Sequence, residues 1–208
     1  MTPTVEDAAS LCEARLLLRE YSHRINNEFA SAISIVSMAA MRSTTDEAKC
    51  TLTAVKDRLF NYAQVHHALE MPESSVLIDG AAYVRSLCRA ISRSKLASQG
   101  IKLVLEEKKF RLHSERCWRL GLIVSELITN SAHHAFAGRG GAIRVELLPS
   151  ASFVECRVTD NGAGEPAARP GHGLKIVNAL AHSLGGTFKQ SFGPHGATSV
   201  LVFPLDPA

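Results

Sequence analysis

The stretch that decides the fold is Asp160-Asn161-Gly162-Ala163-Gly164, which directly follows the apolar run Phe153–Thr159. An acidic residue followed by two glycines favours a loop in which the backbone can come close to a ligand, because glycine carries no side chain. Taken alone, this pattern is often only a turn. Its meaning therefore depends on the segments before and after it.

Two neighbouring segments give the glycine loop a chemical context. Glu126-Leu127-Ile128-Thr129-Asn130 lies in a long apolar helix, where Glu126 and Asn130 share a face because they are four residues apart. Gly171-His172-Gly173 opens another helix, whose free N–H groups favour a phosphate, and Lys175 in its first turn adds a cation. A carboxylate at Asp160 can accept a hydrogen bond from the exocyclic amine of adenine, and the Asn130 carboxamide oxygen suits Mg²⁺. Together the segments describe a pocket for a nucleotide.

The hydrophobic periodicity around the pocket changes between helical and strand spacing. Grouped helices beside a mostly antiparallel sheet predict an α+β sandwich. Ser114 is expected to cap the long helix, with Glu115 in its first turn to suit the helix dipole. The predicted helices span residues 80–98, 114–135 and 173–184, and the predicted strands span 101–105, 110–112, 142–148, 153–159, 187–192 and 197–203.

The first 70 residues differ from the rest, because their apolar residues recur at alternating steps of three and four. This spacing predicts two helices, the second capped by Ser43, Thr44 or Thr45. The apolar stripes are narrow, and a lone helical hairpin has almost no enclosed core. Dimerisation into a four-helix bundle is the economical way to cover them. The stripes comprise Leu18, Ser22, Ile25, Phe29, Ala32, Val36 and Ala39, and then Leu52, Val55, Leu59, Tyr62, His66 and Leu69.

Length and composition exclude several classes of protein. The 208 residues suit one large domain or two small ones, and no apolar stretch approaches the ~18 residues that span a bilayer. The N-terminus lacks a secretory signal, so a soluble cytoplasmic protein is expected. The five cysteines have no paired spacing, which argues against a disulfide framework or a thiolate metal site and predicts buried, reduced cysteines that pack in the core. The nine histidines form no metal-binding pattern.

Charge is divided unevenly along the chain. Residues 1–75 carry a net charge of −3 and residues 76–208 a net charge of +6, against +3 overall. A basic second half suits a polyanionic ligand, but its basic residues do not cluster with aromatic residues as nucleic-acid surfaces often do. Neither a nucleic acid nor a membrane is therefore predicted as a partner.

Residues 114–204 closely resemble the Bergerat-type ATP-binding domain shared by sensor histidine kinases, gyrase-type ATPases and related chaperones. The resemblance rests on the segments quoted above, on Leu184-Gly185-Gly186 and on Gly196-Ala197-Thr198. It implies Mg·ATP binding, with Asn130 on the metal, Asp160 on adenine and a very short lid of six residues, 165–170. His133 stands where the family usually has a lysine. The cofactor-binding residues implied are Asn130, His133, Asp160, Gly162, Gly164, Gly171, Gly173, Leu174, Lys175 and Thr198.

The segment Ser22–Phe29 resembles the phosphoacceptor region of the HisKA_2/HWE-like histidine kinases, whose motif reads His-Arg-Val-Lys-Asn-Asn. His23, Arg24 and Asn27 match it, whereas Asn26 replaces the lysine and Glu28 replaces the last asparagine. His23 lies one position past the apolar stripe and should be exposed to water. An ordinary imidazole has a pKa of about 6.5, so it is largely neutral near pH 7 and can attack a phosphoryl group. His66, on the second stripe, is predicted to be a packed or interhelical residue.

These observations predict a dimeric histidine kinase that uses ATP and Mg²⁺, with His23, Asn27 and Glu126 as catalytic residues. Residues 8–71 would form the dimerisation and phosphoacceptor hairpin and residues 76–206 the catalytic ATP-binding domain. The predicted partners are a response-regulator receiver domain and an upstream sensor or regulatory protein supplied in trans. Two alternatives remain open: a histidine phosphotransfer or scaffold protein with a vestigial ATP-binding domain, and an anti-sigma-type serine kinase.

Overall fold

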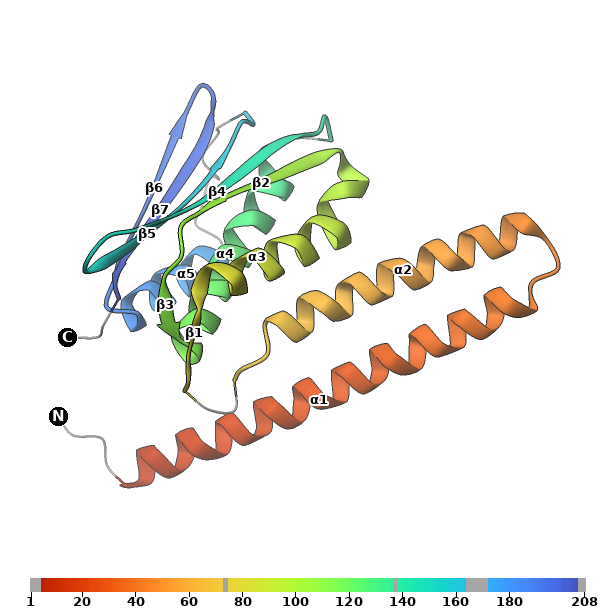
Figure 1. The fold of residues 1–208 in the computed structure, drawn as a ribbon, viewed down its shortest axis with the longest axis horizontal. Coiled ribbons are helices and arrows are strands. Elements are labelled where there is room, and N and C mark those ends of the chain that lie inside the picture. The colour runs from red at the N-terminus through yellow and green to blue at the C-terminus, as the bar shows by residue number, and fades with distance from the viewer. Residues whose placement is uncertain (1–4, 73–74, 137, 164–171, 206–208) are drawn as a thin grey trace. The chain divides into compact units, whose positions relative to one another are not determined.

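The computed structural model describes residues 5–72, 75–136, 138–163 and 172–205. The chain divides into two compact units, Met1–Met71 and Pro72–Ala208. The first unit is helical, and the second combines helices with a sheet, as Figure 1 shows. This confirms the predicted α+β class, with a helical hairpin followed by an α/β sandwich.

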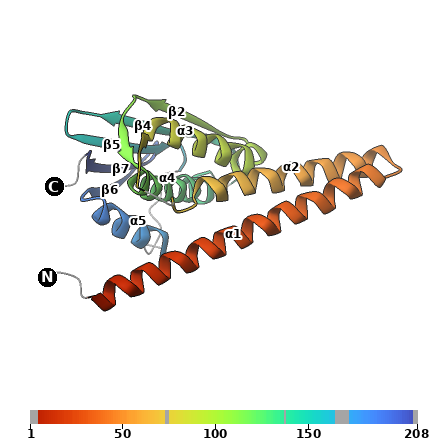
Figure 2. The ribbon, with the colours of Figure 1, turned by 60° about the horizontal axis from the view of Figure 1, so that its bottom comes forward.

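The first unit is an antiparallel hairpin of α1 (Val5–Arg42) and α2 (Asp46–Ala68). The two helices lie side by side, and the N-terminal part of α1 extends past the end of α2 (Figure 2). Thr45 is the cap of α2, because its Oγ1 accepts a hydrogen bond from the Ala48 N–H at 3.3 Å. Most residues of the two predicted stripes are half-buried between the helices, but Leu18, Ala39 and Val55 are exposed.

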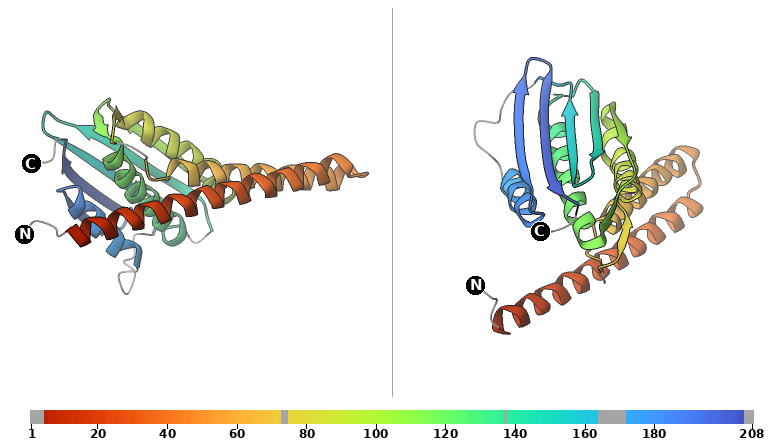
Figure 3. Two further views of the ribbon diagram at one scale, coloured as in Figure 1. Left: turned by 90° about the horizontal axis from the view of Figure 1, so that it is seen from below. Right: turned by 60° about the vertical axis from the view of Figure 1, so that its left-hand side comes forward.

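The second unit is built on a five-stranded sheet. The strands run in the order β2 (Ile101–Glu107), β4 (Gly141–Pro149), β5 (Phe153–Asp160), β7 (Gly196–Pro204) and β6 (Thr187–Gly193). β2 is parallel to β4, and all the other neighbours are antiparallel. The helices α3 (Gly80–Ile91), α4 (Ser114–His134) and α5 (His172–Ser183) lie on one face of this sheet (Figure 3).

The alternation of buried residues along β5 positions the glycine loop. Val154, Cys156 and Val158 are buried, whereas the residues between them are partly exposed. Because successive side chains of a strand point to opposite faces, these residues face the helical layer. Asp160 continues the same register and is only 3% exposed. The last residue of an otherwise apolar core-facing series is therefore a carboxylate.

Several details differ from the expectations. Ser114 does not cap α4: the capping position is His113, and the Ser114 Oγ accepts instead from the Val76 N–H at 3.2 Å. This contact belongs to the junction of the antiparallel pair β1 (Leu77–Asp79) and β3 (Arg111–His113), and β1 was not predicted. The predicted helix 80–98 is also interrupted, because a π-helical turn, Ser92–Leu96, and a 3₁₀ turn, Ala97–Gln99, follow α3.

The cysteines are divided between the core and the surface. Cys88, Cys117 and Cys156 are buried as predicted, but Cys50 is exposed on α2. Burial raises the pKa of each of the three buried thiols to about 12. Within the described parts of the chain, no helix is both long and apolar enough to cross a bilayer.

Candidate functional site

The carboxylate of Asp160 is held in one orientation by three hydrogen bonds. Its Oδ1 accepts from the backbone N–H of Gly162 at 3.1 Å and from that of Ala197 at 3.2 Å. Its Oδ2 accepts from the Ser131 hydroxyl at 2.8 Å. A buried carboxylate is costly unless it is hydrogen-bonded in this way. Each oxygen can accept more than one bond, so the group can still receive a donor from a ligand.

The sequence pattern does not single out Ser131. It follows Asn130 and continues the buried stripe of α4, which runs through Val124 and Leu127 in steps of three and four. The available signal is a serine at the end of an apolar stripe, because a hydroxyl on the side of a helix that faces the core needs a hydrogen-bond partner. Its partner, Asp160, lies 29 residues away in sequence, which is why the sequence alone does not identify it.

Two glycines near Asp160 allow backbone segments to approach each other closely. A Cβ atom on Gly162 would lie 2.3 Å from the backbone oxygen of Ala135, which also accepts a hydrogen bond from the Ala163 N–H at 2.9 Å. Gly196 has a φ of 120°, and a Cβ there would lie 1.9 Å from the backbone oxygen of Asp160. The glycine loop is thus joined to the end of α4 on one side and to the start of β7 on the other.

The polar residues of α4 lie on the side that faces the start of α5. Glu126 and Asn130 are both half-buried, as expected for two residues one turn apart. A Cβ on Gly173 would lie 1.7 Å from the Glu126 Oε1, so the carboxylate of Glu126 is in direct contact with the first turn of α5. Among the described residues, no side-chain hydrogen bond satisfies the Asn130 carboxamide.

The remaining predicted ligands are placed less uniformly. His133 is exposed at the end of α4 and lies edge-on to His134, with 6.3 Å between the ring centroids. Leu174 is half-buried and Lys175 is exposed. Gly164, Gly171 and the predicted lid, residues 165–170, lie outside the described residues.

Thr198 is not brought to the Asp160 carboxylate. It pairs with Thr159 across the sheet, and the two hydroxyl oxygens are 3.5 Å apart. Ser199 and Val158, the next pair, are buried against the helices, so Thr159 and Thr198 lie on the opposite face of the sheet. The residue of this segment that contacts Asp160 is Ala197, through its backbone N–H.

His23 lies on α1 of the first unit and is exposed, as predicted. Arg24 forms an exposed ion pair with Glu20, with 3.0 Å between Nε and Oε1, and Asn27 is exposed one turn after His23. His66 is interhelical, as predicted, because its Nδ1 lies 3.0 Å from the Asn26 Oδ1 and its ring lies against Phe29.

Two family models match the chain in succession. The model HisKA_2, a histidine kinase family, matches residues 20–95, and the model HATPase_c_2, a histidine kinase-like ATPase domain, matches residues 81–201. The first covers the His23 segment and the second covers α4, the glycine loop and α5. The two matches therefore fall on the two groups of residues that the sequence singled out.

Known histidine kinases are similar to this chain in sequence. The sensor histidine kinase PdtaS of Mycolicibacterium smegmatis is 25% identical over 202 residues, which are 89% of this chain and 38% of that protein. Blue-light-activated histidine kinase 2 of Erythrobacter litoralis is 27% identical over 202 residues, 90% of this chain and 57% of that protein. The chain thus spans less than two thirds of the length of either relative.

A solved structure shows the same fold. The histidine kinase domain of a blue-light-activated histidine kinase from Erythrobacter litoralis has a TM-score of 0.60 and 20% identity, over 85% of this chain and 96% of that domain. With the two family matches and the two groups of residues in their expected elements, the chain belongs to the HisKA_2/HWE-like histidine kinases.

Proposed function

We propose that this chain transfers the γ-phosphoryl group of ATP to His23 and passes it on to an aspartate of a response-regulator receiver domain. The single observation that supports this most strongly is the Asp160 carboxylate, buried and oriented by three hydrogen bonds at the end of a core strand. A charged group held in this way in a histidine kinase-like ATPase domain suits the recognition of one defined donor. The exocyclic amine of adenine is such a donor.

The phosphate end of ATP is proposed to lie between α4 and the start of α5. The first N–H groups of a helix have no partner within the helix, and they favour an anion. Glu126 touches Gly173 in this turn, so a phosphate bound there lies beside α4. Lys175, exposed in the same turn, adds a positive charge.

The same region fits Mg²⁺ bound chiefly through the phosphates. Among the described residues, no group of three or more histidine, cysteine or acidic side chains could hold a metal by itself. Mg²⁺ commonly takes few protein ligands and binds substrate phosphates and waters instead. The carboxamide oxygen of Asn130, near the C-terminal end of α4, is a hard ligand of the kind that Mg²⁺ prefers. The cation would offset the negative charge that develops on the phosphoryl oxygens.

His23 is proposed to act as the nucleophile. A ring nitrogen of the neutral imidazole donates its lone pair to the γ-phosphorus, and the bond from that phosphorus to the bridging oxygen breaks. ADP leaves with the electron pair of this bond. Positioning provides most of the catalysis in such transfers. Asn27, one turn after His23, and Glu126, beside the phosphate region, are the catalytic candidates that could orient the reacting groups.

The hairpin is proposed to dimerise into a four-helix bundle. Large apolar side chains on both of its helices are exposed, which a hairpin alone leaves in water. Another hairpin can cover them at helix–helix spacing. On the described part of the hairpin these are Leu16, Leu17, Leu18, Tyr21, Ile35, Met38, Met41, Val55 and Phe60.

Incubation of the full chain with γ-labelled ATP and Mg²⁺ tests the function. We expect label that is lost in acid and kept in alkali, as for a phosphohistidine, and that moves to an added receiver domain. His23→Gln should abolish the label, whereas His182→Gln, at an exposed histidine of α5, should leave it unchanged. Acid-stable label would favour a serine kinase. Undiminished label in His23→Gln would contradict the proposal.

A further inference from the structure

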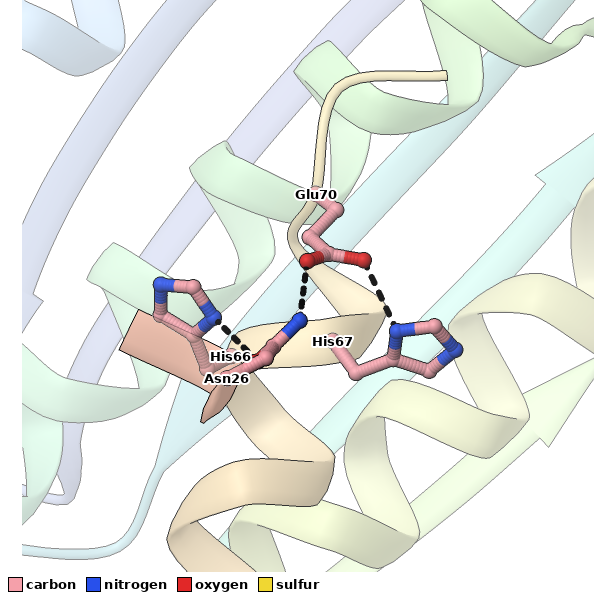
Figure 4. A network of polar contacts seen from close by, with 4 residues as sticks. All are labelled: Asn26, His66, His67 and Glu70. Atoms are coloured by element: carbon pink, nitrogen blue, oxygen red, sulfur yellow. Dashed lines mark hydrogen bonds and ion pairs between the residues drawn. The ribbon is translucent and has the colours of Figure 1, made fainter. Parts of the chain in front are cut away.

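Four polar side chains form a connected network near the end of the hairpin. The Asn26 Nδ2 donates to the Glu70 Oε1, and the Asn26 Oδ1 lies 3.0 Å from the His66 Nδ1. The second oxygen of Glu70 lies 2.8 Å from the Nδ1 of His67 (Figure 4). Asn26 is on α1, whereas the other residues are at the end of α2 or just after it. Asn26 stands where the motif of the HisKA_2/HWE-like kinases has a lysine.

The donors and acceptors of this network can be assigned from Glu70 outward. An ionised carboxylate only accepts hydrogen bonds, so the amide nitrogen of Asn26 must be the atom that faces Glu70. The Asn26 oxygen then faces His66 and can only accept. His66 must therefore carry a proton on Nδ1. The opposite orientation of the amide would place oxygen against oxygen at Glu70 and leave two acceptors unpaired.

Contacts with α1 hold the His66 ring, as well as the Asn26 amide, in one orientation. The ring lies against Phe29 of α1, with 6.1 Å between the ring centroids and 54° between the planes. His66, Asn26 and Glu70 are all half-buried, so water competes for these bonds less than at an open surface. We call Asn26, His66 and Glu70 the hairpin clasp.

The clasp lies at the level of the phosphoacceptor. His23 precedes Asn26 by three residues, so the two side chains lie on neighbouring turns of the same side of α1. Glu70 follows the end of α2 at Ala68 and lies two residues before Pro72, where the second unit begins. A rotation of α1 about its axis would turn His23 and Asn26 together and break both bonds of Asn26.

We propose that Asn26, His66 and Glu70 are positioning residues for the transfer to His23, because they fix the rotation of α1 against the end of α2. The inference rests on the proposed function, since it concerns the direction in which His23 faces the phosphoryl group. The ATP pocket uses none of these residues. Loss of the clasp should therefore lower the rate of transfer from bound ATP without changing the affinity for ATP.

The test exchanges the donor and the acceptor of the hydrogen bond between Asn26 and Glu70. Asn26→Asp alone opposes two carboxylates and should reduce the maximal rate of His23 labelling by about tenfold or more, since small misplacements of reacting groups have such effects. Its KM for ATP should stay unchanged. The double variant Asn26→Asp, Glu70→Gln restores one acceptor and one donor of the same shape, and the new carboxylate on α1 can still accept from His66. Its rate should return to within about threefold of the original.

Thr45→Ala is the matched control, because it removes a hydrogen bond from the other end of the same hairpin. It should lower the melting temperature of the hairpin and leave the labelling rate unchanged. All variants are compared at the same pH, and their melting temperatures are measured. An unrescued rate in a double variant of normal melting temperature would overturn the proposal. So would a rate loss in Thr45→Ala equal to that in Asn26→Asp.

The protonation of His66 gives a readout that does not depend on ATP. The nitrogen chemical shifts of the imidazole distinguish a proton on Nδ1 from one on Nε2, and we expect Nδ1–H in the unaltered chain and in the double variant. A proton on Nε2 alone would overturn the clasp itself. If the unaltered chain takes no label, both the proposed function and the positioning role fail, whereas the His66 result still shows whether the clasp exists as a structural contact.

Discussion

Replacement of Asp160 by asparagine should separate nucleotide recognition from folding. Asparagine has the same shape, and its oxygen can keep the two backbone hydrogen bonds from Gly162 and Ala197. Its NH₂ group then faces the Ser131 hydroxyl, which can rotate and accept instead of donate. All three contacts therefore survive Asp160→Asn, and only the charge and one acceptor are lost.

The expected losses of stability and of ATP affinity follow from the hydrogen bonds that are kept and lost. Hydrogen bonds to a charged group contribute about 1 kcal/mol more than neutral ones, so three of them set an upper limit of about 3 kcal/mol on the loss of stability. The melting temperature should fall by no more than about 10 °C. The amine of adenine would meet an NH₂ group, and one buried donor left without a partner costs about 1–3 kcal/mol. The Kd for ATP should therefore rise about 5- to 150-fold.

The assay combines calorimetric titration with ATP and GTP and thermal unfolding. Guanine has a carbonyl oxygen where adenine has its amine, and this oxygen can accept from the new NH₂ group. The affinity for GTP should therefore rise while that for ATP falls, and the preference for ATP over GTP should fall by more than the affinity for ATP does. Asp160→Ala is the contrasting variant, because it removes the partner of three half-buried donors and should unfold the second unit at a lower temperature than Asp160→Asn does. A folded Asp160→Asn variant with unchanged ATP affinity and selectivity would refute the reasoning.

Three further predictions concern the fold that supports the site. Gly196→Ala should destabilise the second unit by about 3 kcal/mol or more in urea unfolding, since its Cβ would meet the Asp160 backbone. The control Gly100→Ala should cost only about 1 kcal/mol, because Gly100 has a φ of 67° but only an ordinary van der Waals contact near its Cβ position. A thiol reagent should label Cys50 in the native chain, and the buried cysteines should react only after unfolding, as mass spectrometry can show. Stability should also fall as pH rises above about 8.5, because unfolded thiols lose protons there while folding keeps them bound, and unfolding curves between pH 7.5 and 10 measure this effect. The thiols with a pKa raised to about 12 are those of Cys88, Cys117 and Cys156.

The sequence predicted the architecture well where a local pattern sufficed. The alternation of apolar residues in β5 and β7 and the stripes of α4 and α5 gave these elements nearly at their observed bounds. The place of Thr45 before an apolar stripe indicates a possible cap, and Thr45 is the cap of α2. The same reasoning is wrong for Ser114, because its hydroxyl accepts a hydrogen bond from the backbone of a distant segment, which capping preferences cannot reveal.

The short elements and the π-helical turn after α3 were missed for a related reason. β1 has three residues and exists only because it pairs with β3, 34 residues later. The segment Ser92–Leu96 has ordinary helical composition, so nothing local marks its change of hydrogen-bonding pattern. Such features are decided by the partners that surround them rather than by intrinsic preference.

By itself, the sequence determined which residue types were available for the chemistry: a histidine on an exposed helix position, an acid before two glycines, and an asparagine one turn from a glutamate. Tertiary structure decided which of them meet. It directed Asp160 toward Ser131 and Ala197, turned Thr198 to the other face of the sheet, and joined Asn26 to Glu70. Local spacing reports only the direction of a side chain along its own helix or strand, whereas a hydrogen bond between residues 29 to 44 apart depends on how the whole unit packs.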